Sequence, residues 1–362
     1  MGEKNGQNEY IGLFNGLIVD MFEDVANIVR GNPKLAFFIL KTIKNQKSAV
    51  RTREKWEKKG THVPPFMIMS ITGRCNFSCP GCYARPWRDR SDEEIDLERT
   101  ELLFQEATDL GISFILLAGG EPLMRKDILE TASKFSKIVF PVFTNGMLID
   151  EDMIEFFAKN RNLFPVISLE GMEGETDLRR GRGTFARLAE VLEKMKGRGI
   201  FVGTSLTVTR DNFDTVTSED FIGWVHKLGC RLFFFVEYTP VDPGTEDLVP
   251  TQDQRDGLVS VTHSLKMSFG GIFIAFPGEE DLFGGCLSAG RGFVHINPFG
   301  DLEPCPFAPY HDVNLLDVTL EEALRSRFLK EIRANREMLG ETRGGCALWT
   351  HQDWVRSLLE TK

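Results

Sequence analysis

The chain has 362 residues, a formal net charge of −10, and ordinary fractions of hydrophobic (42%) and charged (27%) residues. A chain of this length usually exceeds a single hydrophobic core, so we expect two or three domains. The acidic balance and the lack of a long basic run argue against a nucleic-acid partner, and no apolar run approaches the ~20 residues that span a bilayer. Seven cysteines, without a recognisable signal peptide, predict reduced thiols in a cytoplasmic protein.

Residues 1–62 are expected to form an amphipathic helical segment. Apolar residues recur every three or four positions over 14–29, which is the period of a helix, and a Gly-Asn-Pro sequence at 31–33 would end that helix. A second apolar patch over 35–43 leads into a basic stretch. Two interpretations stay open: helices that pack on the rest of the protein, or peripheral contact with a membrane surface or a lipid substrate.

Residues 63–270 alternate short apolar runs with helical patterns, which is typical of a parallel sheet built from βα units. The expected strands are 66–71, 114–117, 139–143, 166–169, 201–208 and 231–237. Amphipathic helices fit between them, for example over 97–110 and 185–196. Composition and periodicity do not separate an open barrel from a doubly wound sheet.

The most informative motif follows the first expected strand, where barrel enzymes place their chemistry. Cys75, Cys79 and Cys82 have the spacing Cys-x3-Cys-x2-Cys. Three thiolates can each hold one iron of a 4Fe–4S cube and leave the fourth iron open. The alternative is a structural zinc site, but zinc normally takes four Cys or His ligands, often as two Cys-x2-Cys pairs.

This spacing resembles the signature of the radical S-adenosylmethionine (SAM) superfamily. The resemblance implies an α/β fold with a partial (βα)6 TIM-type barrel. It also implies that the open iron chelates SAM, that an electron from a donor such as flavodoxin or ferredoxin cleaves SAM to a 5′-deoxyadenosyl radical, and that this radical abstracts hydrogen from a substrate. The family usually has an aromatic residue before the third cysteine, where this chain has Gly81, so Tyr83 is expected to supply the ring instead.

The ends of the next strands carry residues that the resemblance assigns to SAM. Each turn alone would be an ordinary strand exit, but together they occur in the family's order. In relatives the Gly-Gly-Glu-Pro turn binds the SAM amino group, and the later positions contact its ribose, methionyl part and carboxylate. The implied SAM-binding residues are Gly119, Gly120, Glu121 and Pro122 after the second strand, Thr144 and Asn145 after the third, Ser168 and Glu170 after the fourth, and Arg180 beyond it.

Residues 271–362 are expected to form a small α+β unit with a hairpin over 293–304. Cys286, Cys305 and Cys346 lie in it, in a context that resembles the C-terminal extension called SPASM or, in its shorter form, twitch. The resemblance implies one auxiliary 4Fe–4S cluster with an open iron for substrate, water or a side chain such as His295 or His311. The alternative is three ordinary buried thiols.

We therefore interpret the chain as a radical SAM enzyme of an anaerobic or microaerobic cytoplasm. The apolar N-terminal segment favours a hydrophobic or membrane-associated substrate and peripheral contact with the membrane. No peptide-binding module is evident before the barrel, which disfavours a leader-peptide maturase, but a maturase of a peptide or protein stays open. A non-catalytic iron–sulfur electron-transfer or scaffold protein is the alternative from another class.

Overall fold

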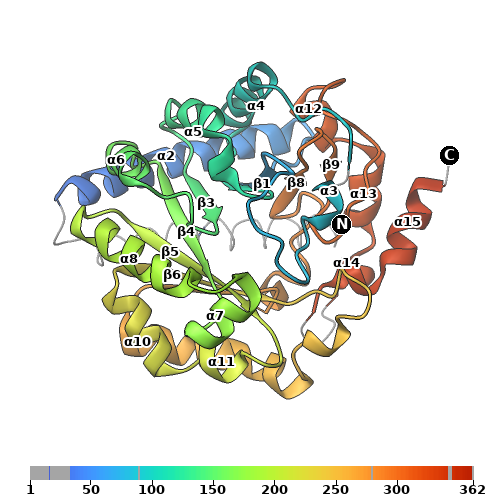
Figure 1. Ribbon diagram of the computed structural model, residues 1–362. Helices are drawn as coiled ribbons and strands as arrows, with labels where there is room; N and C mark the ends of the chain where they lie inside the picture. Colours follow the sequence, from blue (N-terminus) through green and yellow to red (C-terminus); the bar gives the residue numbers. More distant parts are fainter. Residues whose placement is uncertain (1–15, 17–32, 89, 279, 341–344, 361–362) are drawn as a thin grey trace.

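The computed structural model describes residue 16 and residues 33–88, 90–278, 280–340 and 345–360 (Figure 1). The helix expected over 14–29 therefore lies, apart from Gly16, outside the described residues. In the described part of the chain, no helix is long and apolar enough to cross a membrane.

The centre of the molecule is a sheet of nine strands in the order β7-β6-β5-β4-β3-β2-β1-β8-β9. The strands are β1 (Phe66–Ser70), β2 (Phe114–Ala118), β3 (Phe140–Thr144), β4 (Leu163–Leu169), β5 (Val202–Val208), β6 (Cys230–Glu237), β7 (Ile272–Phe276), β8 (Phe293–Ile296) and β9 (Leu302–Glu303). Neighbouring strands from β7 to β8 run parallel, and only β9 is antiparallel to its neighbour. β7 and β9 are the two edges, so the sheet is an unclosed barrel.

Helices surround this sheet (Figure 1). The longer ones are α2 (Pro33–Lys58), α4 (Leu97–Leu110), α5 (Lys126–Ser133), α6 (Glu151–Lys159), α7 (Glu173–Arg180), α8 (Thr184–Gly197), α10 (Glu219–Lys227), α11 (Gln252–Phe269), α13 (Arg327–Ala334) and α15 (Gln352–Glu360). The short ones are α3 (Arg85–Arg88), α9 (Phe213–Val216), α12 (Leu320–Leu324), α14 (Ala347–Thr350), η1 (Pro122–Met124), η2 (Glu246–Leu248), η3 (Glu280–Phe283) and η4 (Arg336–Leu339).

Local sequence explains where these helices begin and end, as α4 illustrates. The Asp96 side chain accepts a hydrogen bond from the backbone N–H of Arg99 and caps the first turn. Gly111 ends the helix at φ +88°, a conformation that costs little without a Cβ. Between these ends, Leu103, Phe104 and other apolar residues of one face are buried in the main core. The helical period seen in the sequence thus becomes the packed face of the helix.

The six expected strands are confirmed as β1 to β6, with small shifts at their ends. The expectation that the βα alternation stops at residue 270 was wrong at one strand. β7 follows α11 and pairs in parallel with β6, with Ile272 opposite Leu232. The alternation therefore continues for one more unit, and residues 272–276 belong to the barrel sheet.

The expected hairpin is confirmed as β8 and β9, which are antiparallel with His295 opposite Glu303. Its first strand also pairs in parallel with β1, so that Phe293 lies opposite Phe66. The hairpin therefore extends the barrel sheet directly beside the strand that leads into the first cysteine motif. The three units 1–62, 63–270 and 271–362 stay a prediction.

Helix α2 covers one end of the barrel. Its Leu35 and Ile39 are buried in one cluster with Phe114, Leu232 and Ile272, which lie at or near the amino ends of β2, β6 and β7. In Figure 1 this helix, drawn in blue, runs behind the strands. Because parallel strands share their amino ends, α2 leaves the carboxyl ends open for a functional site. For residues 33–58 this supports the interpretation of a helix packed on the barrel.

Candidate active site and auxiliary cysteine pocket

The first cysteine motif lies in the loop after β1, as expected, and two glycines hold that loop in place. Gly120 donates its backbone N–H to the carbonyl of Thr72 (2.7 Å), and Glu121 donates its own to the carbonyl of Arg74 (2.8 Å). A Cβ on Gly119 would collide with the Thr72 carbonyl, and one on Gly120 with the Arg74 carbonyl. Because these two residues are glycines, the cysteine loop can lie directly against the turn after β2.

The thiols of this loop are partly exposed and lie among cationic side chains. Burial raises the pKa of Cys75 and of Cys79, while Arg88 lowers it for Cys75 and Arg180 and Arg179 lower it for Cys79. Metal binding requires the thiolate, so these arginines favour the form that binds iron. The arginines therefore offset part of the effect of burial, while the pKa of both thiols stays above its ordinary value.

The spacing of the sulfur atoms bears on the alternative of zinc. Thiolates on one zinc ion lie roughly 3.8 Å apart, because each Zn–S bond is about 2.3 Å long. Among the described residues, neither cysteine triplet has all three Sγ atoms within 4.8 Å of one another. A 4Fe–4S cube separates its thiolates further, since each binds a different iron.

Glu121 joins the ends of β2 and β3. Its carboxylate accepts hydrogen bonds from the Thr144 hydroxyl (2.6 Å) and from the backbone N–H groups of Asn145 (2.8 Å) and Leu123 (3.0 Å). Burial raises the pKa of Glu121 above its ordinary value, and these hydrogen bonds offset part of that rise. Pro122, also buried, begins η1 directly after Glu121. Glu121 thus holds Thr144 and Asn145 in position.

Asn145 lies beside the cysteine loop. Its side-chain amide donates to the Asn76 Oδ1 (2.8 Å) and is 3.9 Å from the Cys75 Sγ. The motifs after β1, β2 and β3 therefore meet at one place, as the shared carboxyl ends of parallel strands require.

Glu170, directly after β4, forms the other side of the site. Its Oε1 lies 2.8 Å from an Arg179 nitrogen and 2.9 Å from the Arg180 Nε. Its Oε2 is buried and has no hydrogen-bond partner among the described groups. A buried carboxylate oxygen without a partner is a ready acceptor for a ligand hydroxyl. Ser168 is half-buried in β4, opposite Ser205 of β5.

The aromatic ring beside the third cysteine comes from a distant part of the chain. Gly81 has φ +65°, and a Cβ there would collide with the hydroxyl of Tyr238, which follows β6. Tyr83 instead packs edge-on against Trp87 (5.6 Å between ring centroids) and Phe307 (5.9 Å). The ring that faces Gly81 is therefore that of Tyr238, and the expectation that Tyr83 packs around SAM stays a prediction.

The second cysteine triplet lines one pocket. Cys286 follows η3, Cys305 follows β9, and Cys346 precedes α14, yet all three line the same cavity together with Glu237 and Glu280. Cys286 and Cys305 are buried and Cys346 is half-buried. Burial raises the pKa of Cys286 and of Cys305 well above that of a free thiol. Three thiols from separate segments around one cavity form a donor set that suits a cluster.

Neither histidine suggested for the open auxiliary iron reaches this pocket. The His295 ring is hydrogen-bonded on both sides, to the Ser70 hydroxyl (2.9 Å) and to the Glu303 carboxylate (2.7 Å). His311 pairs with Asp301 at 3.2 Å. Since neither lines the cavity, that suggestion was wrong.

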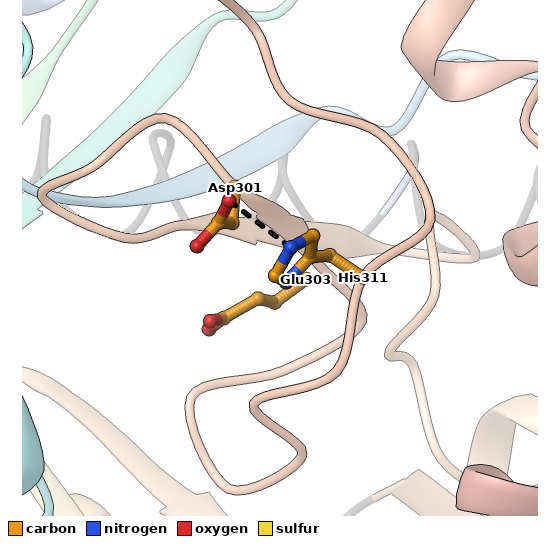
Figure 2. A group of neighbouring side chains, drawn as sticks. All are labelled: Asp301, Glu303 and His311. Carbon is orange, nitrogen blue, oxygen red and sulfur yellow. Dashed lines mark ion pairs between the residues drawn. The ribbon is translucent and has the colours of Figure 1, made fainter. Parts of the chain in front are cut away.

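Asp301, Glu303 and His311 form a compact group of ligand-type side chains on and beside the β8–β9 hairpin (Figure 2). Protein side chains already bind these carboxylates. Asn297 donates to both Asp301 (2.8 Å) and Glu303 (2.7 Å), and Asn314 donates to Asp301 (2.8 Å). This network joins the hairpin to the loops around it.

Three residues of these sites were not among the SAM-binding or cluster-binding residues implied by the sequence. Arg179 pairs with Glu170 as Arg180 does, and the Arg-Arg doublet could have indicated it. Tyr238 beside Gly81 and Glu280 beside the second triplet have no local motif. Only the three-dimensional arrangement places them.

Comparison with known proteins agrees with this geometry. Residues 69–228 match the family model of the radical SAM superfamily. The chain is 26% identical to mycofactocin maturase MftC of Mycobacterium tuberculosis over 319 residues (84% of this chain and 80% of the relative). It is 26% identical to the antilisterial bacteriocin subtilosin biosynthesis protein AlbA of Bacillus subtilis over 256 residues (68% of this chain and 56% of the relative).

Solved structures share the fold. Streptococcus suis SuiB bound to S-adenosylmethionine is 19% identical and superposes with a TM-score of 0.67, covering 90% of this chain and 80% of SuiB. SuiB bound to the precursor peptide SuiA superposes with a TM-score of 0.66, at 19% identity, covering 90% and 79%. With the cysteine loop after β1 and the second triplet around its own pocket, the chain belongs to the radical SAM superfamily: it is an enzyme that uses SAM and a 4Fe–4S cluster, with a C-terminal auxiliary-cluster domain of the SPASM/twitch type.

Proposed function

We propose that the chain is a maturase that modifies a peptide by radical SAM chemistry. The observation that carries this proposal is the similarity to mycofactocin maturase over 319 residues, which is more of the chain than the barrel strands and their helices occupy. The subtilosin biosynthesis protein and the peptide-bound form of SuiB point to the same class of substrate. The sequence alone disfavoured this alternative, and the relatives now favour it over a lipid substrate.

In this proposal Cys75, Cys79 and Cys82 hold the catalytic cluster, where bound SAM, on one-electron reduction, supplies a 5′-deoxyadenosyl radical. Gly119 and Gly120 seat the cysteine loop against β2. Glu121 fixes the turn that carries Thr144 and Asn145, so that Asn145 faces the loop.

The other side of the proposed SAM site is made by Glu170 and its arginines. The free Oε2 of Glu170 accepts a SAM hydroxyl, and Arg179 and Arg180 hold the carboxylate in place. Ser168 lies two residues before Glu170 and adds a hydroxyl to the same region. The electron comes from a small donor protein of the flavodoxin or ferredoxin class.

The proposal is tested with the reconstituted full chain, SAM, a reductant, and synthetic peptides encoded by short reading frames near its gene. We expect formation of 5′-deoxyadenosine together with a change in mass of one peptide. The Cys75/Cys79/Cys82→Ala variant should yield neither product. Deuterium transfer to deoxyadenosine from a labelled lipid or small-molecule extract, with none from any peptide, would contradict the proposal. Absence of reductive SAM cleavage under all conditions would favour an electron-transfer protein.

Membrane contact stays a prediction that depends mainly on residues 1–32. Since Leu35 and Ile39 of α2 are part of the core, deletion of residues 1–62 would damage the fold. Deletion of residues 1–32 is the sharper test. Unchanged vesicle binding by that variant, or no binding by the full chain, would remove the support for a membrane-associated substrate and a peripheral location.

A further inference from the structure

The auxiliary pocket offers three thiols for a cube that has four irons. Most of its remaining wall consists of side chains that do not bind iron: Phe276, Pro277, Phe293 and Phe307, with Thr239 beside them. The carboxylates of Glu237 and Glu280 are the other described groups in the wall that can bind a metal. Among the described residues, these two are therefore the candidates for a fourth ligand, and without either the fourth iron stays open.

Glu237 already forms an ion pair. Its Oε1 lies 2.6 Å from the Nε of Arg255, and its side chain is only 4% exposed. Binding of iron to Glu237 would have to break this buried ion pair, which is costly. Glu237 is therefore the weaker candidate.

Glu280 is held next to one of the thiols. Its Oε1 accepts the backbone N–H of Leu287 at 2.9 Å, and Leu287 directly follows Cys286. The backbone N–H of Gly285 donates to the Glu280 carbonyl at 3.1 Å, so residues 280–287 fold into a tight loop. Glu280 and Cys286 both line the cavity, and the hydrogen bond to Leu287 holds the carboxylate beside the segment that carries this thiol.

We infer that Glu280 is the fourth protein ligand of the auxiliary 4Fe–4S cluster and binds the iron that Cys286, Cys305 and Cys346 leave open. A carboxylate has two oxygens, so iron binding is compatible with the hydrogen bond to Leu287. A positively charged cluster core also removes the repulsion between the Glu280 carboxylate and the ionised Cys286 thiol. The inference rests on the proposed role of the three cysteines and not on the identity of the substrate.

This ligation decides between the two roles that the sequence leaves open for the auxiliary cluster. A cluster with four protein ligands can carry an electron but has no iron free to coordinate substrate. Three-cysteine ligation would leave an iron that binds small anions. The two cases differ in the response of the cluster to added cyanide, which binds only an open iron.

The test uses the full chain with Cys75/Cys79/Cys82→Ala, so that only the auxiliary cluster is present at about 4 irons per chain. The reduced protein is mixed with ¹³C-cyanide and studied by pulsed electron paramagnetic resonance. We expect no ¹³C coupling while Glu280 is present, a clear ¹³C coupling after Glu280→Ala, and loss of that coupling again in Glu280→Cys. Glu237→Gln is the matched control and should not bind cyanide.

Two outcomes overturn the inference. One is ¹³C coupling of equal strength with and without Glu280, which means that the iron is open in the native protein. The other is a Glu280→Cys variant that keeps its irons but shows unchanged g values, since a new thiolate ligand must alter the spectrum. If the Glu280→Ala variant loses its irons, the g values of the Glu280→Cys variant decide whether residue 280 binds the cluster. Because none of these measurements needs a peptide, failure of the peptide proposal would leave their result unaffected.

Discussion

Among single residues, Glu170 combines two features that usually exclude each other. One carboxylate oxygen forms ion pairs with two guanidinium groups. The other oxygen is buried and has no hydrogen-bond partner in the described part of the chain. A buried polar atom without a partner costs free energy. A ligand that donates a hydrogen bond to this oxygen would recover that free energy, so Glu170 is prepared for binding.

We predict that Glu170→Gln lowers SAM affinity at least about tenfold, because breaking a buried ion pair costs on the order of 3–5 kcal/mol, part of which falls on the bound state. Calorimetric titration of the reconstituted enzyme with SAM measures the effect. Glu190→Gln removes an exposed partner of Lys194 and should bind SAM like the wild type. An equal loss of affinity in both variants would contradict the role given to Glu170.

Gly120 lets the turn after β2 lie close to the backbone of the cysteine loop. A Cβ at this position would collide with the Arg74 carbonyl, so Gly120→Ala should displace the cysteine loop and lower the iron content. Overpacking of this kind costs about 1–3 kcal/mol. Iron analysis and thermal unfolding measure both effects. Gly257→Ala in α11 is the matched control because nothing lies within 4 Å of the added carbon. If Gly120→Ala keeps its iron, the loop tolerates the shift and the argument fails.

At the scale of elements, α2 contributes core residues and exposed apolar residues within the same turn. Ile39 is buried at 4% exposure and Leu40 is 64% exposed. We predict that Ile39→Ala lowers the free energy of unfolding by about 2–5 kcal/mol and that Leu40→Ala changes it by less than about 0.5 kcal/mol. Urea unfolding measures both. Similar small effects of the two changes would mean that α2 does not close the barrel in solution.

The β8–β9 hairpin should respond to acid through Asp301. Burial raises the pKa of this carboxyl, but the hydrogen bonds from Asn297, Asn314 and Arg90 and the charge of His311 outweigh burial and lower it below its ordinary value. A lowered folded-state pKa stabilises the fold above the unfolded-state pKa of about 3.9, and this contribution is lost as the pH falls through the folded-state pKa.

Asp301→Asn should therefore be less stable than the wild type at pH 7, and the difference should shrink as the pH falls below about 4. Urea midpoints at neutral and acidic pH measure it. A difference that stays constant between pH 7 and pH 3 would show that the charge of Asp301 does not stabilise the hairpin.

At the scale of the whole molecule, the sequence predicts what local patterns encode. Strands buried in a parallel sheet have continuous apolar runs in their sequence. The strands β1 to β6 and the motifs at their carboxyl ends could therefore be predicted. β7 was missed because glycines and a proline flank its short apolar run. The pairing of β8 with β1 joins residues more than 200 positions apart, and the contacts of Tyr238 and Glu280 are equally remote. No local pattern encodes such contacts.

This same pairing places the β8–β9 hairpin, which Cys305 follows, beside the strand that leads into the first cysteine loop, while each site keeps its own ligands. The thiols of the first site come from one loop after β1, and those of the second come from three segments around a separate pocket. We predict about 8 irons per reconstituted chain, and about 4 in either the Cys75/Cys79/Cys82→Ala or the Cys286/Cys305/Cys346→Ala variant. Iron and sulfide analysis after anaerobic reconstitution measures this. About 4 irons in the wild type, all lost with the first triplet, would mean that the second triplet only packs the core. The auxiliary cluster and its ligation by Glu280 would then both be wrong, while the SAM site would stand.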